Sequence, residues 1–588
     1  TKNLAFSASK TKFKQPLNKK SLLFYLNIEK TYFYHQKKNM KIAIAQQNYH
    51  IGNFTHNFEK IKHAIAQAKA ENADIVVFSE LAVCGYPPRD FLEFKDFIQR
   101  CENTIEKIRL ETENIAVVVG SPSVNPVIEG KDLFNSAYFI ADKEIKHIAH
   151  KALLPTYDIF DEYRYFEPAE SFEIVEYKGK KIAITICEDI WNVGNENPMY
   201  TICPMDILIE QQPDFMLNLS ASPFQYAQAK ERLHIVRTNV ARYKLPIFYV
   251  NNTGGQTELI FDGGSIVMNG DGDLIEELPY FEEAFRCYEL EKVIYPTAEM
   301  TINQEQKKNK TDLIHRALLT GISNYFGKLG FTKAIVGSSG GIDSAVVLAL
   351  AAEALGEKNV HAVLMPSQFS SDHSVADAVK LAENLGCSYD IIPIKNTFDA
   401  FETSLATQFA GTDFDVTEEN IQARIRGTIL MAMSNKFGYI LLNTSNKSEA
   451  AVGYGTLYGD MCGGLSVIGD VYKTETYELA RYLNRNREII PINIIEKAPS
   501  AELRPNQKDS DSLPDYDILD EILYLYIEKR KGLKELVALG FEQKLVDRIL
   551  KLVNRCEYKR YQTPPMLRVS PKAFGMGRRM PIVGKYLS

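Results

Sequence analysis

A glycine-rich stretch in the middle of the chain carries the residue types that hold phosphate groups. Residues 337–344 read Gly-Ser-Ser-Gly-Gly-Ile-Asp-Ser, between the apolar run 333–336 and the helix-like run 345–352. A tight loop between a strand and a helix points backbone N–H groups and the positive end of the helix dipole at one place. The stretch is neither a Walker A loop nor a dinucleotide fingerprint. The glycines alone are therefore compatible with two alternatives, a phosphate-binding loop or a turn without a ligand.

Three reactive side chains in the first half also stand where apolar runs end. Glu80 closes Val-Val-Phe-Ser-Glu, Lys151 follows the strand-like run 145–150, and Cys187 closes Ile-Ala-Ile-Thr-Ile-Cys. Functional groups of α/β folds gather at the carboxyl ends of strands. Each residue also has an ordinary interpretation, since single cysteines are often small buried hydrophobes and single charges lie mostly on the surface. The three must be weighed together.

The elements that position these residues alternate between strand and helix in both halves. In the first half, strands are predicted at 42–45, 74–78, 115–119, 137–140, 182–186, 215–219 and 247–250, and helices at 55–72 and 94–111. In the second half, strands are predicted at 333–336, 361–366, 389–393 and 439–443, and helices at 313–329 and 374–385. Such alternation predicts α/β folds, with a doubly wound parallel sheet in the second half.

Length and composition set further bounds. A chain of 588 residues is too long for one core, which predicts two large domains. The net charge of −7 gives no reason to expect nucleic acid as a partner, and no apolar run is long enough to span a membrane. The eight cysteines form no Cys-x-x-Cys pair. A reducing cytoplasm is therefore the expected compartment.

The expected domain limits follow composition. Residues 1–39 are rich in lysine, resemble neither a signal nor a transit peptide, and are expected to be a poorly ordered extension. Residues 40–295 form the first domain. Residues 296–311 are polar and aperiodic and are predicted to be a linker, and residues 312–588 form the second domain.

Motifs around the three reactive residues resemble the nitrilase superfamily. They are Ser79-Glu80-Leu81 with Gly85-Tyr86-Pro87, His150-Lys151 with Leu154-Pro155, and Ile186-Cys187-Glu188-Asp189. The resemblance implies an αββα sandwich with a Glu80-Lys151-Cys187 triad over residues 40–290. In that chemistry Cys187 attacks an amide carbonyl, Lys151 stabilises the oxyanion, and Glu80 moves the thiol proton to the leaving ammonia.

The amide implied by the resemblance is glutamine. Residues 85–92 and 157–166 are similar to the glutaminase domain of glutamine-dependent NAD synthetases. By that match Tyr157 and Ser222 contact glutamine, and Lys230 is the basic residue for its carboxylate. The spacing to Lys230 is longer than in the common form, and its alternative is a surface charge. The alternative for Ser222 is a strand-end turn.

The loop at 337–344 resembles the pyrophosphate loop of ATP pyrophosphatases, which adenylate a substrate and release pyrophosphate. Further stretches are similar to the NAD synthetases within that group: 419–426, 443–449 with Tyr458-Gly-Asp460, and 499–509 with Tyr558-Lys-Arg-Tyr-Gln562. Without the resemblance, 443–449 would be interpreted as a helix N-cap and 558–560 as a basic surface patch.

The second resemblance assigns residues to each ligand. The ATP set is Gly337, Ser338, Ser339, Gly340, Gly341, Ile342, Asp343, Ser344, Thr444 and Lys473. The deamido-NAD set is Asn420, Arg424, Glu449 and Lys559. Asp343 and Glu449 are the implied Mg²⁺ ligands, and two carboxylates with triphosphate oxygens suit that ion. Leu457 stands where related enzymes often have a substrate-binding lysine.

The implied function is amidation of deamido-NAD, activated by ATP, with ammonia from glutamine through a sheltered passage and in a homo-oligomer. One alternative keeps both chemistries with another carboxylate acceptor, and the stretches 443–449 and 499–509 count against it. Another is a non-catalytic nucleotide-binding protein, which the joint presence of all five catalytic and metal residues disfavours. A tRNA thiolase would need a basic face and a cysteine pair near the loop, and the sequence offers neither.

Overall fold

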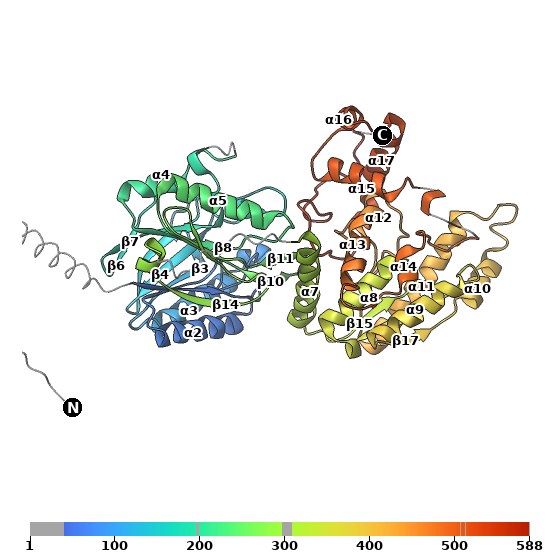
Figure 1. Cartoon of the computed structure of the whole chain (residues 1–588), viewed down its shortest axis with the longest axis horizontal. Helices are drawn as coiled ribbons and strands as arrows, with labels where there is room; N and C mark the ends of the chain where they lie inside the picture. The colour runs from blue at the N-terminus through green and yellow to red at the C-terminus, as the bar shows by residue number, and fades with distance from the viewer. Residues whose placement is uncertain are drawn as a thin grey trace, which may run out of the picture.

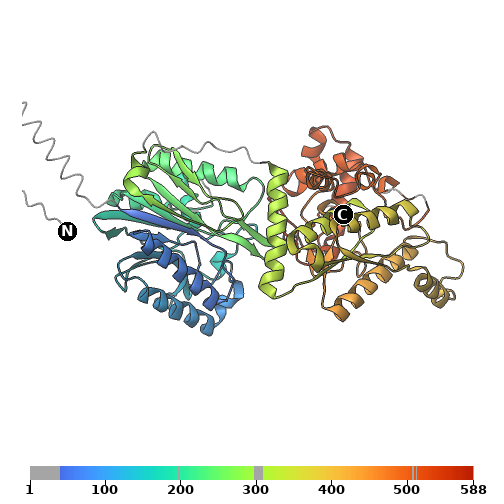
Figure 2. The same cartoon turned by 60° about the horizontal axis from the view of Figure 1, so that its bottom comes forward.

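The computed structural model describes residues 40–195, 199–296, 309–505, 507, 509–511 and 513–586. The expected extension at 1–39 and most of the expected linker lie outside these residues. The described chain forms two lobes, with the long helix α7 (Lys310–Leu329) standing between them (Figures 1 and 2). The last two residues of the expected linker, 310 and 311, form the start of this helix.

Two six-stranded sheets form the first lobe. One has the order β14 (Ala284–Glu289), β1 (Lys41–Gln46), β2 (Ile75–Val77), β3 (Ala116–Val124), β4 (Leu133–Ala141), β5 (Glu144–His150). The other has the order β13 (Leu274–Glu277), β12 (Ile266–Met268), β9 (Ile247–Asn251), β8 (Phe215–Ser220), β7 (Lys180–Ile186), β6 (Val175–Tyr177). In each sheet three consecutive strands pair in parallel, β1–β3 in the first and β7–β9 in the second, and all other pairings are antiparallel.

Helices cover the outer faces of this pair of sheets. Helices α2 (Phe54–Ala70) and α3 (Lys95–Leu110) pack on the first sheet, and α4 (Pro204–Leu208) and α5 (Gln228–Tyr243) pack on the second (Figure 1). The central strands are buried and mainly apolar on both faces. On β1, Ile42 and Ile44 point into the core between the sheets, whereas Ala43 and Ala45 point toward the helices. The predicted αββα sandwich is confirmed.

The second lobe is an open parallel sheet. Its order is β17 (Ser388–Ile391), β16 (Val360–Leu364), β15 (Ala334–Gly337), β18 (Ile440–Asn443), β19 (Leu465–Ser466), and all four pairings are parallel. The helices that flank it are α8 (Ile342–Leu355), α9 (Asp372–Leu385), α10 (Lys395–Leu405), α11 (Val416–Phe437) and α13 (Lys473–Leu483). Strand order reverses between β15 and β18, which is where doubly wound sheets bind ligands. This confirms the predicted fold class.

A helical cap completes the second lobe. It contains α12 (Lys447–Val452), α15 (Tyr516–Ile527), α16 (Leu533–Ala538), α17 (Gln543–Arg555) and α18 (Glu557–Arg560), while α14 (Ile492–Glu496) packs on α8, α9 and α13. Helix α17 buries Val546, Ile549, Leu550 and Val553, which share one face at helical spacing. That face packs against the apolar side of α15.

The lobes meet along α7 and the hairpin of β10 (Thr253–Gln256) and β11 (Leu259–Asp262). Asn48 of the first lobe donates from Nδ2 to Asn324 Oδ1 at 2.6 Å. Lys328 donates to Asn48 Oδ1 at 2.7 Å and to the carbonyls of Tyr49 and Gly255 at 2.8 and 2.9 Å. Burial lowers the pKa of Lys328 to about 7. The contact along α7 is thus specific and polar, in addition to its apolar packing.

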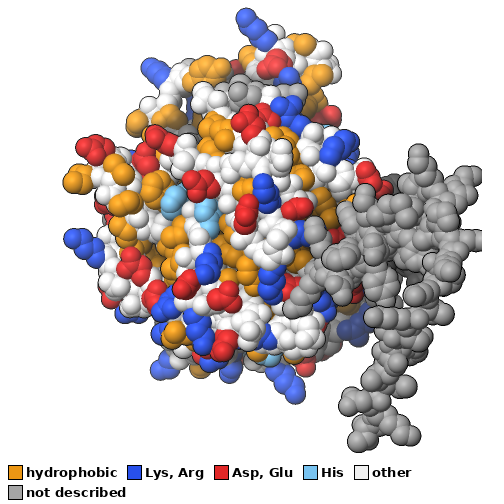
Figure 3. All heavy atoms as spheres, turned by 90° about the vertical axis from the view of Figure 1, so that its left-hand side faces the viewer, with side chains coloured by type: hydrophobic (Ala, Val, Ile, Leu, Met, Phe, Trp, Pro, Cys, Tyr) orange, Lys and Arg blue, Asp and Glu red, His pale blue; other side chains and the backbone are white. Residues whose placement is uncertain are grey.

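The surface of the first lobe carries charges of both signs. Figure 3 views the end of this lobe that is farthest from the second lobe, and Lys, Arg, Asp and Glu side chains alternate there with apolar ones. Within the described part of the chain, none of the helices combines the length and apolar composition that crossing a membrane requires.

Candidate active sites in the two domains

Glu80 and Lys151 are brought into direct contact from different strands of the first sheet. Glu80 follows β2, and Lys151 follows β5. Lys151 Nζ lies 2.7 Å from Glu80 Oε1, and neither side chain has any exposed surface. The other carboxylate oxygen of Glu80 accepts the backbone N–H of Ala221 at 2.9 Å. Two residues 71 positions apart are therefore fixed as a buried ion pair.

A second carboxylate, which the sequence analysis did not assign, completes this cluster. Glu162 accepts from Lys151 Nζ through both oxygens, at 2.9 and 2.8 Å, and from the hydroxyl of Tyr86 at 2.7 Å. Asn135 donates to Glu80 Oε1 at 2.8 Å. Glu162 lies inside the stretch 157–166 that carries the resemblance to glutaminases. Its position in that stretch is the sequence feature that could have indicated a role in the site. Nothing local marks Asn135, which is one buried residue of β4.

Cys187 begins a short turn immediately after β7 and is buried. Its backbone has φ 44°, a left-handed conformation that non-glycine residues adopt mainly at strained functional positions. Burial raises the pKa of the Cys187 thiol well above its usual value, the charge of Glu80 raises it further, and Lys151 opposes both. These surroundings therefore favour the thiol over the thiolate, and a nearby base is needed to make the sulfur a nucleophile.

The charges of the cluster suit that proton transfer. Glu80, Lys151 and Glu162 carry one net negative charge when all three are ionised. A proton moving from Cys187 to Glu80 makes the cluster neutral and leaves the thiolate beside Lys151. Burial lowers the pKa of Lys151, but the charges of Glu162 and Glu80 outweigh this effect and hold the pKa well above its usual value. The arrangement can support nucleophilic attack by sulfur with a carboxylate as the base.

Asp189 ties the end of β7 to the loop that follows Lys151. Its Oδ1 accepts the backbone N–H groups of Ala152 and Leu153 at 3.0 and 2.9 Å, and its Oδ2 accepts that of Ile186 at 2.9 Å. Burial raises the pKa of Asp189 to about 6, although these three donors oppose the shift. Through these backbone contacts, the carboxylate fixes the position of Cys187 relative to Lys151.

His150 gives this region a pH dependence. Burial lowers the pKa of His150 to about 4, and its ring stacks on Phe134 and contacts the Ser136 hydroxyl at 2.7 Å. Because this pKa is below the unfolded value of about 6.5, folding favours the neutral ring. The contribution to stability is complete above about pH 6.5 and is lost as the pH falls toward 4.

We therefore expect His150→Asn to lose less stability than the wild type when the pH falls from 7.5 to 5.0. The measurement is the urea midpoint of each protein at the two pH values. His63→Asn is the control, because His63 is exposed on α2. Equal shifts in the His150 variant and the wild type would contradict the assignment.

Tyr157 is connected to the residue after the nucleophile, Glu188, by a hydrogen bond. The hydroxyl groups of Tyr157 and Tyr200 both donate to Glu188 Oε1, at 2.9 and 2.8 Å, and Glu188 directly follows Cys187. Burial raises the pKa of Glu188. Tyr157 is partly exposed, whereas Glu188 is buried. Tyr200 and Glu188 were not assigned to glutamine by sequence.

Ser222 and Lys230 differ in placement. Ser222 is buried at the end of β8, and its backbone N–H donates to Asn251 Oδ1 at 2.9 Å. Its hydroxyl accepts from Gln228 Nε2 at 3.4 Å. Lys230 is exposed on α5, and no hydrogen bond within the described residues joins its side chain to Ser222 or Tyr157. Ser222 thus lies next to Ala221, whose N–H contacts Glu80, whereas Lys230 lies on the surface.

The glycine loop of the second lobe lies between β15 and α8, as its pattern predicts. Gly340 has φ 78°, and a Cβ there would lie 2.2 Å from the carbonyl oxygen of Ser374, so only glycine fits. Ser338 is buried, and its hydroxyl has no partner among the described residues. A buried hydroxyl without a partner is costly unless a ligand satisfies it. The loop has the form of an anion cradle at a helix N-terminus.

Two carboxylates and a lysine meet beside this loop. Lys473 Nζ donates to Asp343 Oδ2 and lies 3.6 Å from Glu449 Oε1. Asn446 donates to Asp343 Oδ1 at 2.9 Å and also caps α12, which carries Glu449. Burial and then the charge of Asp343 raise the pKa of Glu449 to about 8. Carboxylates that repel each other in this way favour a cation between them.

A cavity of about 280 Å³ opens over these groups. Thr444, Asp343, Glu449 and Lys473 line it together with most of the glycine loop. Within the described residues, His, Cys, Asp and Glu do not form a metal-holding group of three or more. Asp343 and Glu449 fit a divalent ion that takes its remaining ligands from phosphate and water, as Mg²⁺ does.

The other three residues assigned to deamido-NAD gather on the segment 453–457. Asn420 accepts from the Thr456 hydroxyl at 2.7 Å, and Arg424 Nε donates to the carbonyl of Leu457 at 3.3 Å. Lys559 Nζ donates to the carbonyls of Gly453 and Gly455 at 2.9 and 2.7 Å. These residues are not in the lining of the 280 Å³ cavity, although Glu449 is. They hold the segment 453–457 in place at the side of this cavity.

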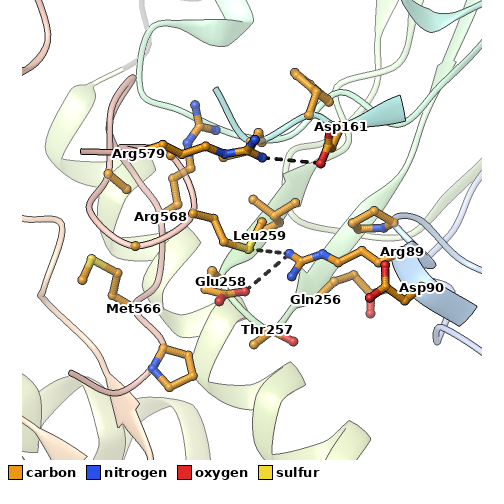
Figure 4. A pocket seen from close by; sticks show the side chains of 18 of the residues that line it. Arg89, Asp90, Asp161, Gln256, Thr257, Glu258, Leu259, Met566, Arg568 and Arg579 are labelled. Atoms are coloured by element: carbon orange, nitrogen blue, oxygen red, sulfur yellow. Dashed lines mark hydrogen bonds and ion pairs between the residues drawn. The ribbon is translucent and has the colours of Figure 1, made fainter. Parts of the chain in front are cut away.

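A larger cavity of about 990 Å³ lies between the domains (Figure 4). Tyr86 and Glu162 line it from the first domain, so it adjoins the buried cluster around Lys151. A third cavity shares Thr563 and Pro564 with it. That third cavity shares Gly427 and Cys462 with the cavity over the glycine loop. The third cavity is thus a neighbour of both the 990 Å³ cavity and the 280 Å³ cavity.

Two protein families match this chain, one in each domain. The carbon-nitrogen hydrolase family matches residues 41–299, and the NAD synthase family matches residues 314–563. The glutamine-dependent NAD(+) synthetase of Synechocystis sp. is 45% identical over 551 residues, covering 92% of this chain and 98% of that protein. The protein of the same name from Thermotoga maritima is 38% identical, with 93% and 99% covered.

A solved structure is similar over the same length. It is the glutamine-dependent NAD+ synthetase of Acinetobacter baumannii in complex with adenosine diphosphate, which is 37% identical with a TM-score of 0.74. The match covers 93% of this chain and 99% of that one. With two family matches in one chain and relatives that align along nearly their whole length, the chain belongs to the family of glutamine-dependent NAD(+) synthetases.

Proposed function

We propose that this ligase joins two reactions: glutamine hydrolysis by Glu80, Lys151 and Cys187, and ATP-dependent amidation of deamido-NAD at the loop 337–344. The observation that carries the proposal is one pair of contacts, one in each domain. Lys151 pairs with Glu80 beside Cys187, and Lys473 contacts Asp343 at the glycine loop.

In the first domain, glutamine enters beside Tyr157 and Ser222, and Cys187 attacks its amide carbon. Glu80 takes the thiol proton and returns it to the leaving ammonia, while Lys151 stabilises the negative oxygen. Water activated by Glu80 then hydrolyses the thioester. Glu162 and Asn135 hold Lys151 and Glu80 in place. Lys230 is the weakest member of the glutamine set because its side chain is exposed.

In the second domain, the nicotinate carboxylate of deamido-NAD attacks the α-phosphorus of ATP, and ammonia then displaces AMP. The amides of residues 337–344 receive the phosphates, and Thr444 and Lys473 complete the ATP contacts. Asp343 and Glu449 would hold Mg²⁺, which supplies charge neutralisation for the leaving pyrophosphate. The bound ADP of the Acinetobacter relative supports an adenine nucleotide here. Asn420, Arg424 and Lys559 shape the loop beside deamido-NAD.

The test of this scheme is the fate of ATP. With deamido-NAD, glutamine and MgCl₂, we expect one AMP and one pyrophosphate for each NAD, because adenylation breaks the bond at the α-phosphorus. Chromatography of the nucleotides and a pyrophosphate assay give both ratios. ADP and inorganic phosphate as products would refute adenylation.

The three neighbouring cavities support a passage for ammonia. It runs from the wall formed by Tyr86 and Glu162, past Thr563 and Pro564, to the cavity beside Asp343. In the same assay, glutamate formed in step with NAD supports transfer along this route. Glutamate formed well in excess of NAD would mean that ammonia escapes.

A cytoplasmic location and a homo-oligomer are also part of the proposal. All eight cysteines lie in the described residues as free thiols, which fits a reducing compartment. Light scattering on the purified enzyme would determine the number of subunits.

A further inference from the structure

One arginine of the second domain lies at the glutamine site of the first. Arg568 Nη2 donates to Asp158 Oδ2 at 3.0 Å, and Nη1 donates to the carbonyl of Phe224 at 3.1 Å. Its side chain is 8% exposed. Asp158 directly follows Tyr157, and Phe224 lies two residues after Ser222. A single guanidinium thus joins the two segments that carry the proposed glutamine contacts.

The segment that carries Arg568, residues 565–572, is fixed to the second domain. The backbone N–H of Ser466, in β19, donates to the carbonyl of Pro565, and the N–H of Leu567 donates back to the carbonyl of Ser466. Asp470 accepts the backbone N–H groups of Val569 and Ser570 at 2.8 and 2.7 Å. These bonds hold Arg568 on the sheet that also carries the ATP site.

Asp470, which holds the segment 565–572, belongs to a buried cluster of charged side chains. Lys447 Nζ lies 3.0 Å from Asp470 and 2.8 Å from Glu528, and all three side chains have no exposed surface. Lys447 also donates to the Ser570 hydroxyl at 2.7 Å. Breaking a buried pair of this kind strongly destabilises a fold. The segment therefore cannot shift without disturbing the core of the second domain.

The same segment binds the first domain through its backbone. The N–H of Arg568 donates to the carbonyl of Glu258 at 2.9 Å, and the N–H of Tyr226 donates to the carbonyl of Val569 at 3.0 Å. Lys572 Nζ donates to Asp158 Oδ1 at 2.9 Å, so both oxygens of that carboxylate are held from the second domain. Asp158 has φ 53°, a left-handed conformation that aspartate adopts more readily than most residues.

We propose that Arg568 is a positioning residue of the glutamine site, supplied by the second domain. It sets the distance between Tyr157 and Ser222 by holding Asp158 and the Phe224 carbonyl on one planar group. An arginine suits this task because its donors are rigidly oriented, whereas a lysine has one flexible point of charge. The inference rests on the proposed glutamine contacts of Tyr157 and Ser222. It makes the glutaminase site dependent on the docked second domain.

The test separates glutamine binding from NAD synthesis. In the full-length enzyme, we expect Arg568→Met to raise KM for glutamine roughly tenfold, because small misplacements of binding groups are costly. The kcat with saturating ammonium chloride should stay within twofold of the wild type, since that reaction does not use the glutamine site. Arg568→Lys should give an intermediate KM.

A mutant cycle and a matched control sharpen the result. Asp158→Asn should also raise KM for glutamine, and the double variant should be no worse than the worse single variant, because both act through one contact. Arg579→Met is the control. Arg579 lies eleven residues further along and also faces an aspartate, Asp161 at 3.7 Å (Figure 4), but its side chain is 65% exposed. Its KM should stay within twofold.

Each outcome decides the inference. An unchanged glutamine KM in Arg568→Met overturns it, and so does an equal loss of glutamine- and ammonia-driven synthesis, which would indicate a purely structural role. Tyr157→Phe distinguishes this failure from failure of the proposed function. If Tyr157→Phe leaves the glutamine KM unchanged, the glutamine contacts are wrong and the inference falls with them. If it raises the KM and Arg568→Met does not, only the role of Arg568 is wrong.

Discussion

Cys187→Ala abolishes NAD synthesis driven by glutamine and leaves synthesis driven by ammonium chloride intact. The expected loss in the glutamine reaction is about 10⁴-fold or more, the effect of removing the nucleophile from a unit that acts together. The reason is that Cys187 is the proposed nucleophile of the site formed with Glu80 and Lys151, and alanine has no sulfur to attack the amide carbon of glutamine. The measurement is the rate of NAD formation from deamido-NAD and ATP with each nitrogen source.

Another buried cysteine of the first domain provides the control. Cys203 is buried, and its sulfur contacts the Tyr243 hydroxyl at 3.2 Å rather than the Glu80–Lys151 pair. Cys203→Ala should therefore keep both activities. If Cys187→Ala retained glutamine-driven synthesis, the nucleophile would have to be reassigned. If it lost both reactions equally, the substitution would have damaged the whole enzyme.

Asp343→Asn has the opposite selectivity: NAD synthesis falls with both nitrogen sources. Asp343 pairs with Lys473 and lies at the start of α8 beside the phosphate loop. Removing its charge leaves Glu449 as the one remaining proposed Mg²⁺ ligand, and we expect a loss on the order of 10²–10³-fold from weaker charge stabilisation. Rates measured over a series of MgCl₂ concentrations should also show a higher Mg²⁺ requirement.

The neighbouring helix provides a matched control for this variant. Asp372 occupies the first turn of α9, as Asp343 does in α8, but it is exposed. Asp372→Asn should keep the wild-type rates. Glutamate release by Asp343→Asn in the absence of ATP should equal that of the wild type, because the first domain is unchanged. An Asp343 variant with normal rates and a normal Mg²⁺ requirement would remove Asp343 from the metal site.

Local sequence was sufficient for the elements and for the groups adjacent in the chain. The glycine loop, the strand before it and the helix after it occupy consecutive residues, so their conformation depends mainly on the residue types within that stretch. Apolar runs of strand length likewise located β1, β7 and β8, because strands buried on both faces are apolar throughout. The order of the motifs in the chain was enough to identify the family.

The partners of each functional group depended on tertiary structure. Glu162 lies inside a stretch that carries the family resemblance, yet only the fold shows that it shares Lys151 with Glu80. Lys230 was assigned by its position in a motif, and the turn of α5 leaves it exposed. Chain position alone does not specify which side chains share a buried volume, and burial is what determines whether a charge needs a partner.

The contacts between the domains were the least accessible from sequence. Arg568 lies 410 positions from Asp158 and in no recognised motif, so nothing local links the two residues. Their pairing exists because the sheet edge at Ser466 and the hairpin of the first domain both bind the segment 565–572. The sequence by itself determined the two folds, the loop and the family, since these follow from short-range patterns. Tertiary structure decided which charges meet and that the second domain contributes to the glutamine site, since such contacts arise only when distant segments pack together.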